Sequence, residues 1–505
     1  MKESGSLEIQ VDVDASMENN GMNNMFKESN DQNGETQQEA NTSSENKVNI
    51  DQLVIDIEKG FESSDPKSDS STKPCIYKVP GHLRKVNAKA YTPTLISIGP
   101  FYHRYLRFQT MEMRKLRYVK RFRDREDSEE AELLKKLLIT IDKKKEDIRS
   151  CYSNLPSFDY EDDDFVKMIL VDAIYILELF LSCFQKTDKL DESNQENHDS
   201  ADPIKAEPWM LSVVTLDLVL LENQLPFFVI KGLYNNDFST KPETPPLIQL
   251  IFEFFKDFNV QNMKPEGFNV EIKHFTDLLR NFYLLAPTTS SKSKRCNCFN
   301  WITRKPASKS ITRNERPPRK EVRKLLYSAT QLHEAGVKFE KSTSKCLLDL
   351  DFDKSNGVLK IPGLELNDSA EARIRNVMAY EQFDLGEKIF ITDYLIILDF
   401  LINTNKDMDL LCDQEIVVNY LGDNKVATSV VNRLNTEVSW LGIDSKYSNI
   451  CEELNDFGKE PRNRWIAILR HEYFNTPWRG AATIAAFILL LLTLIQSVCS
   501  IYQVV

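Results

Sequence analysis

Residues Phe165 to Phe184 read FVKMILVDAIYILELFLSCF, a stretch that is either a membrane span or a long helix of a folded domain. It carries three charged residues, Lys167, Asp172 and Glu178. Each charge would cost about 2.5–3.5 kcal/mol at the centre of a bilayer, so a span is disfavoured here. Lys167, Glu178 and Ser182 fall near one stripe of a helix. The stretch therefore predicts a mostly buried helix with one solvated edge.

Two further apolar stretches are similar. Residues Met210 to Ile230 read MLSVVTLDLVLLENQLPFFVI, and Pro226 is expected to end or kink this helix. Residues Ile389 to Asn403 read IFITDYLIILDFLIN, with Asp393 placed to cap the helix near its start. The periodicity of the body is therefore mainly helical.

One stretch alternates instead. Residues Cys346 to Pro362 read CLLDLDFDKSNGVLKIP, with apolar and polar positions alternating on both sides of Ser355-Asn356-Gly357. Alternation around Asn-Gly is typical of a β-hairpin. The predicted fold is thus mainly α, a single large helical domain over 74–476 with a small β-hairpin element.

The segment before this domain has a different composition. Residues 1–73 hold 16 Asp or Glu against 6 Lys, which accounts for most of the net charge of −12 of the 505-residue chain. Such an acidic leader, poor in aromatic residues, cannot bury enough apolar surface to fold and is predicted to be disordered. Ile50 to Phe61 has helical spacing and could dock as a short helix. The leader has no apolar core of a signal peptide.

A second break, 287–320, carries ten basic residues and one Glu. We interpret it as a disordered insertion, either a solvated loop or a contact for anionic lipid. Cys296 and Cys298, beside Phe299 and Trp301, would suit lipidation there. A lone C-x-C supplies too few ligands for zinc, and the nine scattered cysteines indicate reduced thiols. No nucleic-acid partner is expected.

The C-terminal stretch, 481–505, contains no charged side chain. About 20 apolar helical residues can cross a bilayer, so 481–501 is predicted to be a transmembrane helix. Trp478, Arg479 and Tyr502 would be its interfacial anchors. Arginines precede the stretch and none follows it, which predicts a tail-anchored, single-pass protein with a cytosolic body, at the plasma membrane rather than an endomembrane. The alternative is a buried C-terminal helix of a soluble domain.

Short motifs follow one another along the whole body. They are Ile76-Tyr77-Lys78-Val79-Pro80, Leu83-Arg84, Ala90-Tyr91-Thr92-Pro93, Ser97-Ile98-Gly99-Pro100-Phe101-Tyr102-His103, Met111-Glu112, Lys115, Asp217, Glu222-Asn223-Gln224-Leu225-Pro226-Phe227-Phe228, Ala329-Thr330-Gln331-Leu332, Ala335-Gly336-Val337-Lys338-Phe339, Arg375-Asn376, Ala379-Tyr380-Glu381-Gln382 and Pro477-Trp478. This series resembles the plant-specific family catalogued as domain of unknown function number two hundred and forty-seven. The resemblance runs from about Cys75 to the C-terminus and leaves out the leader and the basic insertion.

The resemblance implies a plant protein with one large helical domain and a C-terminal membrane anchor. It implies no reaction, because no enzymatic activity is established for the family. Some members in grasses are tied to the self-incompatibility loci that govern pollen–stigma recognition. The family can therefore act in recognition, although nothing in this sequence identifies it as such a member.

The polar motif residues allow two readings. Asp217 and Glu222, with His103, could be the carboxylates and base of a hydrolase-like enzyme. Alternatively, they form a structural polar motif in which Glu222, Asn223 and Gln224 satisfy backbone groups around Pro226. No phosphate-binding loop, nucleophile elbow or metal-ligand spacing occurs in the sequence. We therefore expect no catalytic residue, cofactor or metal.

Two function classes follow. The first is a non-catalytic, membrane-anchored interaction, recognition or signalling module with an unknown protein partner. The second is an enzyme without a recognised motif that uses Asp217 and Glu222. Converging carboxylates and His103 in a deep pocket would favour the enzyme, whereas a packed domain with an exposed apolar patch would favour the module.

Overall fold

The computed structural model describes residues 74–125, 130–153, 155, 160–188, 208–235, 244–284, 324–384, 389–438, 442–461 and 477–504. The chain divides into two units, Met1–Ser68 and Asp69–Val505, and all described residues belong to the second. The predicted acidic leader, the helix at Ile50 to Phe61 and the basic insertion with Cys296 and Cys298 lie outside the described residues. The domain bounds 74–476 stay a prediction.

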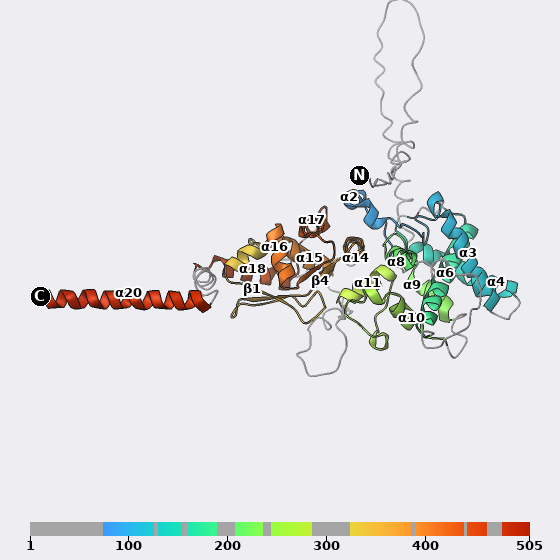
Figure 1. The fold of residues 1–505 in the computed structure, drawn as a ribbon. Helices are drawn as coiled ribbons and strands as arrows, with labels where there is room; N and C mark the ends of the chain where they lie inside the picture. The colour runs from blue at the N-terminus through green and yellow to red at the C-terminus, as the bar shows by residue number, and fades with distance from the viewer. Residues whose placement is uncertain are drawn as a thin grey trace, which may run out of the picture. The chain divides into compact units, whose positions relative to one another are not determined.

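The first group of helices gathers on one long helix, α6 (Asp162–Asp188) (Figure 1). The group comprises α2 (Gly81–Val86), η1 (Ala88–Tyr91), η2 (Leu106–Phe108), α3 (Gln109–Arg125), α4 (Glu130–Asp142), α5 (Lys145–Ser150), α8 (Pro208–Asp217), α9 (Phe227–Leu233), α10 (Leu247–Phe254), η5 (Lys256–Phe258), η6 (Pro265–Gly267) and α11 (Phe275–Leu284). α6 packs against α3, α4, α9 and α10. The predicted long, mostly buried helix is confirmed.

The predicted solvated edge of this helix is wrong in part. Lys167 is exposed, but Glu178 and Ser182 are buried, with 1% and 3% of their surface exposed. The reason is that four helices cover α6, so that no continuous stripe is left open to water. A helix covered in this way is apolar nearly all round.

The second helical stretch also differs from its prediction. The helix α8 ends at Asp217 and not at Pro226, because residues 218–226 form a turn. Pro226 instead immediately precedes α9, as the residue that caps its N-terminus with extended backbone. The sequence therefore folds as two short helices with a polar loop between them.

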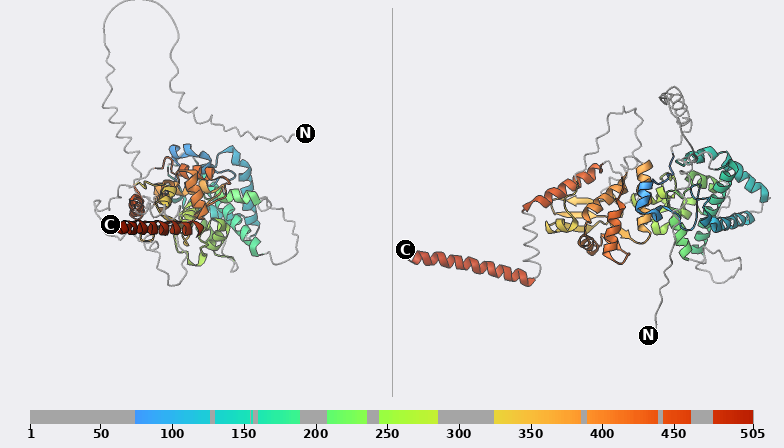
Figure 2. Two further views of the ribbon diagram at one scale, coloured as in Figure 1. Left: turned by 60° about the vertical axis from the view of Figure 1, so that its left-hand side comes forward. Right: turned by 90° about the horizontal axis from the view of Figure 1, so that it is seen from above.

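The second group of helices packs beside two small sheets, in the yellow-to-orange part of Figures 1 and 2. Its helices are α13 (Ala329–Glu334), α14 (Ala370–Asp384), α15 (Phe390–Leu401), α16 (Asn405–Asp413), α17 (Asn424–Leu434) and α18 (Ser445–Lys459). The predicted helix at Ile389 to Asn403 corresponds to α15. The N-cap residue of that helix is Ile389, and Asp393 lies inside its first turn. The Asp393 carboxylate accepts the backbone N–H of Asp444, the residue that caps α18. α14 packs on η1 and α11 and so links the two groups.

The predicted β-hairpin is confirmed, with shorter strands. β2 (Asp351–Asp353) pairs antiparallel with β3 (Val358–Ile361), and Gly357 in the turn has φ +63°. β1 (Lys338–Lys341) pairs parallel with β3 and completes a three-stranded sheet in the order β1-β3-β2. β4 (Leu364–Leu366) and β5 (Val417–Asn419) form a second, parallel pair, which the sequence did not predict.

The C-terminal stretch forms one helix, α20 (Pro477–Val504). Within the part of the chain that the structure describes, no helix combines the length and the apolarity required for crossing a membrane. The transmembrane helix predicted at 481–501 is therefore not confirmed. Of the predicted interfacial anchors, Trp478 is 85% exposed, and the side chains of Arg479 and Tyr502 lie outside the described residues.

Candidate functional site

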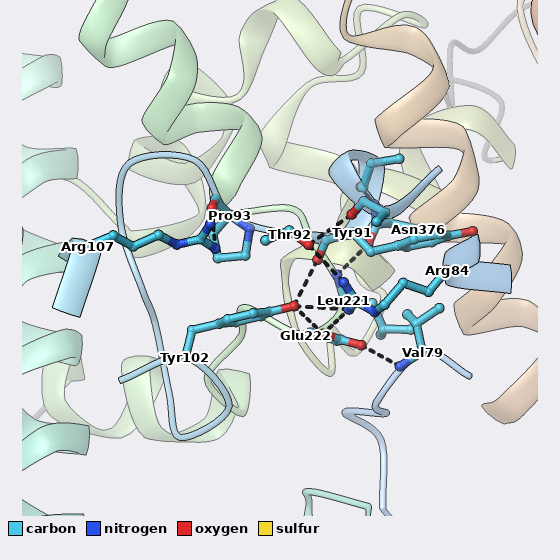
Figure 3. A network of polar contacts seen from close by, with 12 residues as sticks. Val79, Arg84, Tyr91, Thr92, Pro93, Tyr102, Arg107, Leu221, Glu222 and Asn376 are labelled. Atoms are coloured by element: carbon cyan, nitrogen blue, oxygen red, sulfur yellow. Dashed lines mark hydrogen bonds and ion pairs between the residues drawn. The ribbon is translucent and has the colours of Figure 1, made fainter. Parts of the chain in front are cut away.

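The loop between α8 and α9 is where the polar motif residues meet the start of the domain. Figure 3 shows Val79, Arg84 and Tyr102, all from the segment 76–103, converging on Glu222 of this loop. Asn376 of α14 approaches the same loop from the other side. We call this arrangement the Glu222 clamp, because its contacts fasten the segment 76–103 to the loop.

Asp217 binds the backbone of the segment. Its carboxylate accepts N–H bonds from Thr94 at 2.8 Å, from Leu95 at 2.7 Å and from Ile96 at 3.0 Å. Burial raises the pKa of Asp217 to about 6, although these three N–H groups act in the opposite direction. Three donors on two buried oxygens make this carboxylate a cap for the chain reversal after Pro93.

Both carboxylate oxygens of Glu222 also accept hydrogen bonds, and only 2% of the residue's surface is exposed. Its Oε1 accepts the Val79 N–H at 2.6 Å, and its Oε2 accepts Arg84 Nη2 and the Tyr102 hydroxyl, each at 2.5 Å. Burial alone would lower the pKa of Arg84, but the Glu222 carboxylate and the Tyr102 hydroxyl together raise it above its ordinary value. The result is an ion pair between a buried carboxylate and a half-buried guanidinium, and both carboxylate oxygens have hydrogen-bonded partners.

The side-chain amide of Asn223 makes the hydrogen bonds that a backbone peptide group would make. Its Oδ1 accepts the Ile98 N–H at 2.6 Å, and its Nδ2 donates to the Ile96 and Asp217 carbonyls at 3.0 and 2.9 Å. The side-chain amide thus pairs with 96–98 as a neighbouring strand would. It also binds the carbonyl at the end of α8, which, among the described residues, otherwise accepts only a long bond of 3.4 Å from the Leu220 N–H.

Gln224 completes the loop. Its Nε2 donates to the Leu218 and Leu220 carbonyls at 2.6 and 2.7 Å, and its Oε1 accepts the Phe275 N–H at 2.9 Å. The predicted role of these amides in satisfying backbone groups fits this geometry. The groups concerned lie at 217–220, at 96–98 and at Phe275, however, and not at Pro226.

His103 lies beside Glu112 and Tyr160. Its Nδ1 is 3.6 Å from Glu112 Oε2, and its ring lies 6.3 Å from that of Tyr160. The described hydrogen bonds of Asp217 and Glu222 lead to other groups. The structure therefore does not bring the three residues of the hydrolase-like hypothesis into hydrogen-bond contact.

A buried lysine supports the same segment, and sequence reasoning assigned it no role. Lys115 is fully buried and donates from Nζ to the Ser97 carbonyl and Asp172 Oδ1, each at 2.5 Å, and to Glu112 at 2.6 Å. Asp172 in turn accepts the Gly99 N–H at 2.8 Å. The charge of Asp172 within the apolar stretch of α6 was the one available indication.

Gly99 allows this close approach. It has φ +71°, and a Cβ there would lie 2.6 Å from the Gln224 carbonyl oxygen. A side chain at this position would therefore be strained by its backbone and would clash with the loop. The Gly-Pro motif at this point serves chain reversal against the clamp.

Asn376 joins the clamp to the second group of helices. Its Oδ1 accepts the Leu221 N–H at 2.8 Å, and its Nδ2 donates to the Ala90 carbonyl at 2.7 Å. Glu381, further along α14, accepts Arg280 Nε at 2.8 Å. Among the residues with described placement, no group of three or more His, Cys, Asp or Glu is arranged to hold a metal ion.

Comparison with known proteins gives a consistent result. The family DUF247, described as plant protein of unknown function, matches residues 76–492. The chain is 29% identical to the UPF0481 protein At3g47200 of Arabidopsis thaliana, over 85% of this chain and 86% of that protein. It is 22% identical to a second Arabidopsis thaliana UPF0481 protein, At3g02645, over 88% of this chain and 93% of that one. No solved structure matches the chain.

Proposed function

The chain belongs to the DUF247 family of plant proteins of unknown function, and from this premise we propose that it is a non-catalytic, membrane-attached module for interaction or recognition. One observation carries the proposal. The polar residues most suited to chemistry, Asp217 and Glu222, have their oxygens occupied by donors of the segment 76–103. A carboxylate used in this way positions backbone and has little capacity left for a substrate.

The segment that the clamp holds leads directly into an apolar surface. Leu106 in η2 and Met113 in α3 are 84% and 62% exposed, and Tyr105 and Leu116 are 55% and 45% exposed. Exposed apolar side chains that lie close together along a chain are typical of protein-binding surfaces. We propose that this η2–α3 surface contacts the protein partner, and that the clamp keeps it in place.

Proximity labelling in plant cells with the full chain tests this proposal. A Leu106→Asp, Met113→Asp double variant should lose the labelled partner while it keeps its cellular level. Tyr420→Asp is the matched control, because Tyr420 is 64% exposed outside this surface. Equal labelling by the double variant and the control would contradict the assignment of this surface.

Membrane attachment is the second part of the proposal. We propose that α20 anchors the chain in a membrane with a cytosolic body, at the plasma membrane in preference to an endomembrane. The support is the absence of charge from 481–505 and the exposure of Ile484, Phe487 and Leu490 by 53, 65 and 70%. Apolar side chains exposed along a helix favour a lipid environment.

Alkaline carbonate extraction checks this part. The full chain should remain in the pellet, whereas a chain ending at Arg479 should be extracted. Asn41-Thr42-Ser43 and Asn367-Asp368-Ser369 are glycosylation sequons, and glycosylation of either would place the body on the other side of the membrane. Extraction of both chains alike would show that α20 is not an anchor.

A further inference from the structure

A pocket of about 820 Å³ opens between the two helical groups. Leu211 and Leu216 of α8, with Phe254 of α10 and Phe258 of η5, form much of its apolar lining. The residues 367–369, just before the N-terminus of α14, form another part. A volume of this size is in the range of small-molecule sites.

Arg373 is the buried charge in this pocket, with 5% of its surface exposed. Its Nη1 and Nη2 donate to the Tyr283 hydroxyl and to Asn367 Oδ1, each at 3.2 Å, and both partners are neutral. Its Nε has no hydrogen-bond partner among the described residues, and no described carboxylate pairs with it. Its guanidinium lies 4.9 Å from the centre of the Phe258 ring. A buried cation without a counter-charge is costly, so a bound anion would stabilise it.

The surroundings limit what this anion can be. The N-terminus of α14, a helix of 15 residues, adds a partial positive charge next to Arg373. The carboxylates of Asp257 and Asp368 are exposed in the lining and repel negative charge on a ligand, and this repulsion is twice as large for a dianion as for a monoanion. Glu253 is neutralised by Lys256 at 3.0 Å. A single negative charge therefore suits the pocket better than a phosphate dianion.

We propose that this pocket binds a small monocarboxylate with an apolar, aromatic or aliphatic body. The carboxylate accepts hydrogen bonds from the Arg373 guanidinium, and the body packs against Leu211, Leu216 and Phe254. The site is distinct from the Glu222 clamp and goes beyond the proposed interaction function, since it gives the module a ligand. No bond is made or broken in this step.

Calorimetric titration of the full chain with 3-phenylpropanoate tests the proposal. The matched probes are 3-phenylpropanamide, which has the same body without charge, and 3-phenylpropyl phosphate, which is largely dianionic. The carboxylate should bind about ten- to a hundredfold more tightly than the amide, because a hydrogen bond to a charged group is at stake. It should also bind more tightly than the phosphate. Equal affinity for carboxylate and amide, or no binding of the carboxylate, would overturn the proposal.

Two variants locate the site. Arg373→Met should remove the preference for the carboxylate over the amide, and Leu216→Trp should weaken both probes by filling the pocket. Since Arg373 also bonds to Tyr283 and Asn367, its variant is first checked by thermal melting. If it does not fold, Leu216→Trp and the comparison of probes decide. Lys406→Gln, at an exposed position outside the lining, is the control. Unchanged carboxylate binding in Leu216→Trp would place the ligand elsewhere.

Discussion

Glu222 accepts hydrogen bonds from a backbone N–H, a guanidinium and a phenol, all within 2.6 Å. Replacing the carboxylate by an amide of equal size keeps the packing but removes the charge opposite Arg84. The amide also turns an N–H₂ group toward donors, so that at least one of the three donors loses its acceptor. If Glu222 has a structural role, its replacement by glutamine should therefore lower the stability of the fold. A catalytic role would not require this loss of stability.

Glu222→Gln should therefore lower the free energy of unfolding by about 1.5–3 kcal/mol and reduce cellular abundance with it. Thermal melting and quantitative blotting measure both effects, with the exposed Glu334→Gln as control. An unchanged melting temperature and level, together with lost biological activity, would favour the hydrolase-like alternative with Asp217 and Glu222 as working carboxylates.

The contribution of Asp217 to the free energy of unfolding should depend on pH with a sign opposite to that of most carboxylates. Its pKa of about 6 in the folded state lies above the ordinary value of 3.8, so the folded chain binds more protons between pH 4 and 6. The contribution of Asp217 to stability is therefore complete below pH 4 and falls by about 3 kcal/mol as the pH rises through 6.

Urea unfolding of the wild type and of Asp217→Asn at pH 4.5 and pH 7 measures this contribution. The asparagine cannot titrate, so the stability advantage of the wild type should be larger at pH 4.5 than at pH 7. An advantage that grows toward pH 7 would show that the three N–H donors outweigh burial.

At the scale of elements, Gly357 is required by the hairpin for two reasons. Its φ of +63° is unfavourable for other residues, and a Cβ would lie 2.8 Å from Phe457 Cζ of α18. Gly422 offers a matched control, because its φ is +87° and no atom lies within 4 Å of its Cβ position. Left-handed backbone alone costs about 1–2 kcal/mol for a non-glycine residue.

Gly357→Ala should thus destabilise the protein by more than the 1–2 kcal/mol or so expected for Gly422→Ala. Shortening the neighbour, with Phe457→Leu, should recover part of the difference in the double variant. Chemical unfolding of the four proteins measures the effect. Equal losses at the two glycines would mean that α18 moves freely away from the turn.

The basic insertion 287–320 remains a prediction at the same scale. Its ten basic residues should attract an anionic leaflet, and an acyl chain on Cys296 or Cys298 would add to this attraction. In liposome flotation, a chain without 481–505 should bind vesicles containing phosphatidylserine, and added salt should weaken the binding. If the chain bound neutral vesicles equally well, or bound neither kind of vesicle, the insertion would be a solvated loop without a lipid contact.

Periodicity predicted α6 and α15 because their apolar positions are dense and continuous over several turns. The end of α8 at Asp217 was not predicted, since the amides of Asn223 and Gln224 take over the carbonyls that a longer helix would bond internally. The strands of β4 and β5 are three residues each, and their pairing joins Leu364 to Val417. Such short segments have no periodicity of their own to detect.

The sequence predicted the carboxylates of the candidate site but not the residues that bind them. Asp217 and Glu222 stand out as charges in an apolar stretch, and their choice depended on that contrast. Their partners could not be found in the same way, because Glu222 lies 143 positions from Val79 and Asp217 lies 123 from Thr94. No local pattern specifies pairs that are so distant in sequence.

For the whole molecule, the predicted organisation can be tested by limited proteolysis. The composition of the acidic leader and of the basic insertion predicts that 1–49 and 287–320 are cut first, with the helical domain between them protected. Mass spectrometry of the early fragments locates the cuts. Protection of both segments would contradict the predicted domain bounds.

The contacts of Asn376 also set an order of events during synthesis. Its amide donates to the Ala90 carbonyl across 286 positions of the chain. At about 5–20 residues per second, a ribosome needs roughly 15–60 s to make that interval. The segment 76–103, with its apolar turn residues, leaves the ribosome long before the last of its partners exists. We therefore expect nascent chains to need chaperone protection of the segment 76–103 until Asn376 has been made, well before α20 emerges.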